Sequence, residues 1–113
     1  MTARFYPAQV VRWLDGDTLE VDIDQGFNGR QREHVRLLDY DAPESHQPLH
    51  DAATARAEEL APIGAWVTLE SHKNSARSFI RWLGRIHLDD GRDVAKVLEA
   101  EGLTKAVALK LQL

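Results

Sequence analysis

Apolar and polar residues alternate through the first third of the chain, and this pattern predicts three strands. Residues 10–14 are rich in β-forming side chains, and after a short turn Leu19, Val21 and Ile23 alternate with polar neighbours. Two glycines and an asparagine in residues 25–29 favour a hairpin loop, which leads into a third strand over residues 31–38. The first part of the chain is therefore expected to form three consecutive strands joined by short turns.

The pattern becomes helical after residue 50. Residues 51–61 are rich in alanine and glutamate, Asp51 is a candidate cap at the start of this helix, and Pro62 is expected to end it. Residues 66–70 predict a fourth strand. Asp93 can cap a second helix, which Gly102 is well placed to end.

Residues 75–88 fit two structures. Their apolar positions recur at helical spacing, which favours a helix. Against this, Gly84 interrupts the run, and residues 82–88 lead into the turn residues 89–91 as a strand would. Periodicity alone leaves both structures open.

Composition narrows the class of protein. The chain has 113 residues, 43% of them hydrophobic and 28% charged, as in an ordinary globular domain, and it contains no repeat or linker. Residues 1–113 are therefore expected to form a single domain. The 14 Lys and Arg against 18 Asp and Glu give a net charge of −4, which argues against a nucleic-acid binder that acts by charge alone. The absence of cysteine excludes disulfide scaffolds, thiol nucleophiles and cysteine-ligated metals.

Targeting signals are not visible in the sequence. No apolar run approaches the ~18 residues needed to cross a bilayer, so no membrane partner is expected. The first residues show no signal peptide, which favours an intracellular protein, although a mature secreted chain with a new Met1 would look the same. The sequence does not set the oligomeric state.

Acidic and basic residues gather at the predicted strand ends. Asp17 shares the parity of the inward-facing row, an awkward position for a carboxylate, and alone it is best explained as a turn residue. A second group, containing Arg36, Asp41 and Glu44, follows around Pro43. Together these residues offer two hard oxygen ligands for a divalent cation, a further carboxylate able to activate water, and an arginine able to bind phosphate. Phosphodiester hydrolysis needs this combination.

Two motifs and a later helix provide a resemblance to a known family. They are Asp15-Gly16-Asp17-Thr18, then Val35-Arg36-Leu37-Leu38 with Asp41-Ala42-Pro43-Glu44, and the helix between Gly91 and Gly102. Residues 10–109 are similar in this way to the thermonuclease, or staphylococcal nuclease-like, domain family. The first two motifs together are much more specific than either alone.

The resemblance implies a role for each matching residue. Asp17 and Asp41 would ligate Ca²⁺, with the Ala42 carbonyl as a further ligand. Glu44 would be the general base for the attacking water, and Arg36 would hold the phosphate.

The family's second catalytic arginine matches Arg81 in this sequence. Arg85 offers a rival alignment because it follows Gly84, but Arg81 leaves enough residues for a full strand before the turn at residues 89–91. The match has departures, since Arg77 stands near the place of the usual acid and Ile80 where Gly or Asp is usual.

The resemblance also implies the fold. It favours a strand over residues 82–88 and so a mainly β protein with α-helices, built as a five-stranded OB-type Greek-key barrel with two helices. The chain stops at Leu113, and the further helix of better-known members is expected to be absent.

The implied function is that of a Ca²⁺-dependent nuclease. It would hydrolyse DNA, with RNA as a further candidate, break the P–O5′ bond and leave 3′-phosphates, with a preference for single-stranded or locally unpaired substrate. The alternative is a non-catalytic module of the same family that binds nucleic acid or protein. A third interpretation is a structural barrel with an acid-rich loop.

Overall fold

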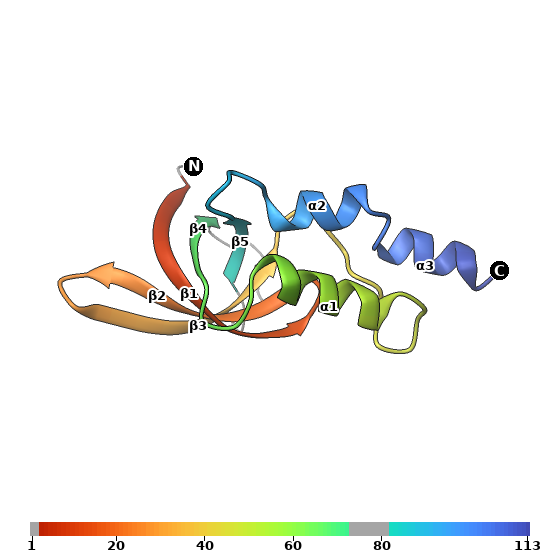
Figure 1. The fold of residues 1–113 in the computed structure, drawn as a ribbon, viewed down its shortest axis with the longest axis horizontal. Coiled ribbons are helices and arrows are strands. Elements are labelled where there is room, and N and C mark those ends of the chain that lie inside the picture. The colour runs from red at the N-terminus through yellow and green to blue at the C-terminus, as the bar shows by residue number, and fades with distance from the viewer. Residues whose placement is uncertain (1–2, 73–81) are drawn as a thin grey trace.

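The five strands form a closed barrel. A computed structural model of the protein describes residues 3–72 and 82–113. The strands are β1 (Arg4–Asp15), β2 (Thr18–Gly26), β3 (Gly29–Leu37), β4 (Trp66–His72) and β5 (Trp82–His87), and the helices are α1 (His50–Leu60), α2 (Val94–Ala100) and α3 (Lys105–Leu111). Around the barrel their order is β1-β2-β3-β5-β4 (Figure 1). The predicted five-stranded OB-type barrel, mainly β with α-helices, is confirmed.

The strands closing the barrel settle the ambiguous segment in part. β5 begins at Trp82 and runs parallel to β3, with Val35 opposite Trp82, and antiparallel to β4. A strand over residues 82–87 is therefore confirmed, whereas residues 73–81 lie outside the described part of the chain. β1 is longer than expected because residues 4–9 pair with β4 while residues 8–15 pair with β2.

The alternating apolar residues fill the barrel interior. Leu19, Leu37, Leu69 and Ile86 are almost completely buried and come from four different strands. Gly84 lets β4 and β5 approach closely, because a Cβ there would lie only 2.9 Å from the Glu70 carbonyl oxygen. Most polar residues of the same strands face outward, whereas Thr18 of β2 is buried.

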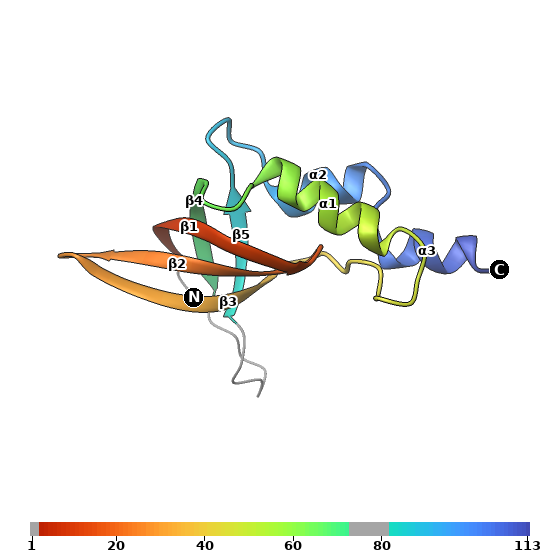
Figure 2. The same ribbon diagram turned by 60° about the horizontal axis from the view of Figure 1, so that its bottom comes forward.

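The helices gather at one end of the barrel, opposite the tip of the β2–β3 hairpin (Figures 1 and 2). The small buried residues Ala53 and Ala57 let α1 pack closely. A Cβ on Gly16 would lie 3.0 Å from the Ala53 Cβ, so the turn between β1 and β2 packs directly on α1. This helix therefore supports the turn that contains Asp17.

Helix starts and ends show what the sequence predicted and what it missed. The prediction of Asp51 as the cap of α1 is wrong: Leu49 is the cap residue, without a side-chain hydrogen bond, and Asp51 lies in the first turn, where its charge suits the helix dipole. The Asp93 cap of α2 is confirmed, since its side chain accepts from the Ala95 amide. Gly102 ends that helix with φ of 76°, as expected.

A third helix was not predicted. The Thr104 side chain caps α3 by accepting a hydrogen bond from the Val107 amide. The expectation of two helices is thus incomplete, because a threonine cap directly after the Gly102 turn starts a new helix. Leu109 and Leu111 on α3 are exposed. Within the described residues, no helix has the length and apolarity that crossing a membrane requires.

Glu70 on β4 gives the fold a predicted pH dependence. His72 Nε2 and His87 Nε2 lie 2.5 and 2.9 Å from its two carboxylate oxygens, and the hydrogen bonds, that of His72 first, lower the pKa of Glu70. Because its pKa is lowered in the folded state, ionised Glu70 stabilises the fold at pH values above the ordinary carboxyl pKa. This stabilisation is lost as the pH falls through the lowered pKa of Glu70. Glu70→Gln should therefore lose about 1 kcal/mol at pH near 7. Urea unfolding of both proteins should show this difference shrinking below pH near 4; a constant difference would contradict it.

Candidate active site

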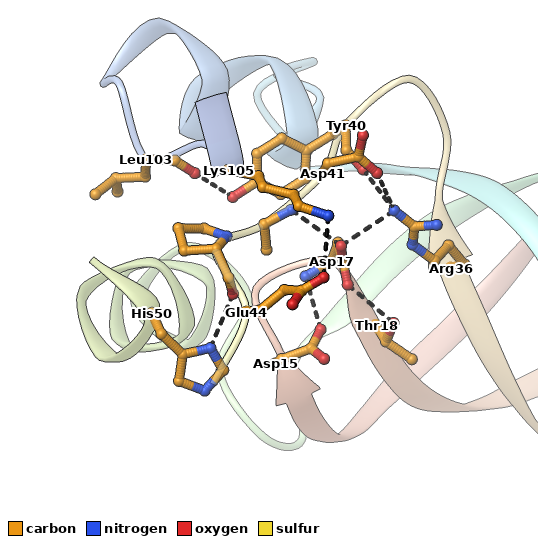
Figure 3. Close-up of polar contacts among 12 residues, drawn as sticks. Asp15, Asp17, Thr18, Arg36, Tyr40, Asp41, Glu44, His50, Leu103 and Lys105 are labelled. Carbon is orange, nitrogen blue, oxygen red and sulfur yellow. Dashed lines mark hydrogen bonds and ion pairs between the residues drawn. The ribbon is translucent and has the colours of Figure 1, made fainter. Parts of the chain in front are cut away.

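The candidate site lies where the β1–β2 turn meets the end of β3. Thr18 of β2 pairs with Arg36 of β3, and the Leu37 amide donates to the Asp17 carbonyl oxygen over 2.8 Å. The loop after β3 then turns back over the Asp17 side chain (Figure 3). The two sequence motifs are therefore adjacent in the fold.

Asp17 is buried, and both of its side-chain oxygens accept hydrogen bonds. Its Oδ2 accepts from the Ala42 amide over 3.0 Å and from Arg36 Nη2 over 3.2 Å, and its Oδ1 accepts from the Thr18 hydroxyl over 3.1 Å. These donors explain how a carboxylate is tolerated at the end of an apolar row. Asp17 consequently connects the turn, β3 and the loop after β3.

The pKa values of Asp15 and Asp17 are shifted in opposite directions. Burial acts to raise the pKa of Asp17, but hydrogen bonds from Asp15 and the Ala42 amide, together with the Arg36 charge, outweigh it, so this pKa is lowered. The pKa of Asp15 is raised to about 6 by burial and then by its contacts with Asp17. The negative charge of the pair is therefore concentrated on Asp17, beside Arg36.

Arg36 brings the acidic groups to one point. Its Nη2 donates to Asp17 Oδ2, to Asp41 Oδ1 and, over 3.2 Å, to the Tyr40 carbonyl oxygen. Burial acts to lower the pKa of Arg36, but the charges and hydrogen bonds of Asp17 and Asp41 outweigh it and raise this pKa. Arg36 thus stays protonated, with Asp17 and Asp41 on the same nitrogen.

Asp17 and Asp41 are the residues here that would supply oxygen ligands to a hard divalent cation. Carboxylate and carbonyl oxygens are the ligands that Ca²⁺ prefers, and Asp41 is largely exposed, so water can complete a coordination shell. No group of three or more His, Asp or Glu able to hold a metal occurs in residues 3–72 and 82–113, so a bound ion would depend on such water. Ala42 donates its amide to Asp17, and a ligand role for its carbonyl stays a prediction.

Glu44, the expected base, is half exposed and paired with Lys105. Lys105 Nζ lies 3.0 Å from Glu44 Oε1, and His46 Nδ1 lies 3.9 Å from Oε2. The hydrogen bond from Lys105 lowers the pKa of Glu44. The Lys105 amide also donates to the Asp41 carbonyl oxygen over 2.9 Å, so this lysine links Glu44 to the Arg36 cluster (Figure 3).

The loop after β3 is fixed by residues that sequence reasoning missed. The buried Tyr40 donates its hydroxyl to the Leu103 carbonyl oxygen over 2.5 Å, and burial raises the pKa of this phenol. His50 Nδ1 lies 3.0 Å from the Pro43 carbonyl oxygen. Neither contact has a local sequence signal, because each partner is distant in the chain or depends on the loop geometry.

The structure describes only one of the two candidates for the second catalytic arginine. Arg81, the expected catalytic residue, lies outside the described residues, and its role stays a prediction. Arg85 donates to Asp39 over 2.6 Å and to Asp93 over 3.2 Å. It therefore ties β5 to the β3 loop and to the start of α2, which gives it a structural use.

A cleft adjoins the cluster formed by Asp17, Arg36 and Asp41. It has a volume of about 660 Å³ and is lined in part by Arg36, Tyr40, Asp41, Leu83 and Lys105. Its lining mixes polar side chains, among them Asp39, Glu99 and Thr104, with apolar ones. A substrate group can therefore reach Arg36 from solvent.

Comparison with known proteins gives a partial match. No protein-family model matches the chain. It is similar to two proteins named "Uncharacterized endonuclease", from Escherichia coli O157:H7 and Escherichia coli, with 32% identity over 94 residues in each case. The matched region covers 83% of this chain but only 56% of each relative, so the chain spans about half the length of these proteins. The names of these two proteins are those of nucleases, and the similarity does not identify a staphylococcal nuclease-like family.

Proposed function

We propose that this domain is a metal-dependent nuclease that hydrolyses phosphodiester bonds in DNA, with RNA as a further substrate. The observation that supports this most is the convergence of Asp17 and Asp41 on Arg36, beside a cleft that Arg36 and Asp41 line. Phosphoryl transfer needs positive charge held rigidly beside hard oxygen ligands. The endonuclease names of the similar proteins agree with this chemistry.

The residues divide the work of an in-line hydrolysis. Asp17 and Asp41 would hold Ca²⁺, which supplies positive charge against the charge developing on the phosphoryl oxygens. Arg36 binds a phosphoryl oxygen through its guanidinium, and Arg81 is proposed as the second such donor. Glu44 accepts a proton from the attacking water. The new O–P bond forms as the P–O5′ bond breaks, leaving a 3′-phosphate, and the O5′ leaving group takes a proton from solvent.

A non-catalytic nucleic-acid-binding module is the second candidate. The ion pair between Glu44 and Lys105 favours it, because Lys105 occupies the carboxylate that would act as base. A catalytic site requires that substrate or metal draw Glu44 away from this lysine.

Cleavage of labelled single-stranded DNA, with Ca²⁺ or with a chelator, tests the proposal. The expected result is cutting that needs Ca²⁺ and leaves 3′-phosphate ends, which become substrates for end labelling only after phosphatase treatment. A labelled RNA in parallel tests the second substrate. Strand binding without cutting in Ca²⁺ would overturn the nuclease proposal and support the binding module.

A further inference from the structure

Arg36 is the last member of a row of basic residues on β3. Val35 and Leu37 are buried in the barrel, so the alternate residues point outward. The β3 row is defined as Arg30, Arg32, His34 and Arg36. At the rise of a strand it extends about 20 Å from the candidate site toward the hairpin tip, at the end opposite the helices (Figure 2).

Two carboxylates of β2 beside the row, those of Glu20 and Asp22, are less exposed than the side chains of Arg30 and Arg32. Glu20 and Asp22 on β2 have side chains only 15% and 23% exposed, whereas that of Arg32 is 59% exposed. Asp22 binds Arg30 over 2.9 Å, and Glu20 binds Arg12 over 2.7 Å. A ligand arriving from solvent therefore meets more of the Arg30 and Arg32 side chains than of these two carboxylates, despite the negative net charge of the chain.

An aromatic ring flanks the row. Trp66 at the start of β4 is 47% exposed, and the Arg30 guanidinium lies 5.0 Å from the centre of its ring. A cationic line beside an exposed aromatic ring is the arrangement that binds single strands, because phosphates follow the charges and an unpaired base stacks on the ring.

We propose that the β3 row binds the sugar–phosphate backbone of a single strand that extends out of the candidate site. The inference rests on the proposed function for the nature of the substrate. Arg36 holds the phosphate to be cut, and Arg32 and Arg30 hold phosphates further along the same strand. A single line of guanidiniums matches one backbone, and stacking on Trp66 needs an unpaired base, so the row selects single strands over duplex.

Binding measured in chelator tests the row without cleavage. The probe is a fluorescently labelled oligothymidylate of about 20 nucleotides, longer than the row, beside one of about 4 nucleotides. We expect Arg30→Gln/Arg32→Gln to weaken binding of the long strand about tenfold and to reduce the salt slope by about 1.4, the value for two lost phosphate contacts. The short strand should lose less than twofold. Lys110→Gln on α3, at the opposite end of the molecule, is the matched control.

A variant that binds the strand more tightly shows that the weaker binding of the double variant is not caused by misfolding. Glu20→Gln removes a carboxylate beside the row and should tighten binding of the long strand about threefold, which an unfolded variant would not do. Three results would overturn the proposed role of the β3 row. The double variant could bind the long strand as tightly as the wild type, it could lose the same affinity for both strand lengths, or the Lys110 control could lose as much affinity as the double variant. Duplex that binds with the same dependence on Arg30 and Arg32 would overturn the preference for single strands. Row-dependent binding without cutting in Ca²⁺ would contradict the nuclease proposal alone.

Discussion

Glu44→Gln is expected to cut single-stranded DNA about 10³-fold more slowly than the wild type, because glutamine cannot accept the proton of the attacking water. The substitution keeps the size of the side chain and leaves an amide oxygen that can accept from Lys105. Glu44 is half exposed, so the fold should not change. Single-turnover cleavage, with strand binding in chelator as the control, separates loss of chemistry from loss of binding. Cutting at more than a tenth of the wild-type rate would remove Glu44 from the role of base.

Lys105 gives this prediction a pH signature. A base acts in its deprotonated form, so the cleavage rate falls as pH drops through the pKa of Glu44. Lys105 lowers that pKa by a hydrogen bond and by its charge, which moves the acidic fall of the rate to lower pH. Lys105→Met should move the fall back to higher pH while leaving Glu44 in place. A pH profile of kcat/KM that does not change in this variant would mean that the fall belongs to another group.

The strands were predictable because their information is local. Leu19, Val21 and Ile23 alternate with polar residues, and this alternation alone sets which face of β2 enters the barrel. The strand β5, which closes the barrel, was not predictable in the same way. The apolar spacing of this segment favours a helix, whereas Gly84 argues against one. What decides for the strand is pairing with β3 and β4, which are distant in the sequence.

The candidate site shows the same division. The sequence motifs predicted that Asp17, Arg36 and Asp41 lie close together, and they do. The reason is that these residues stand at paired strand ends and in the loop that follows. The role of Lys105 was not predicted, because it donates to Glu44 across a separation of 61 residues. Its place depends on the Gly102 turn and on the Thr104 cap of α3, so only the folded chain reveals it.

Arg36→Lys is expected to slow cleavage about 10²-fold even though it keeps the positive charge. Arg36 uses one nitrogen, Nη2, for Asp17, Asp41 and the Tyr40 carbonyl oxygen. Among residues 3–72 and 82–113 its other N–H groups have no hydrogen-bond partner, so they can bind phosphate in the same plane. The single ammonium of lysine cannot serve the carboxylates and a phosphate in this geometry.

The comparison that isolates the guanidinium uses Arg92→Lys as its control, because Arg92 is half exposed and pairs with Asp90 within a surface turn. Cleavage by this control should match the wild type, and thermal melting should show that the Arg36 variant remains folded. Arg36→Lys should also bind the short strand more weakly, since the lost contact is to the phosphate in the site. If it cuts as fast as the wild type, charge alone is sufficient at this position, and the planar donor group of Arg36 has no part in the reaction.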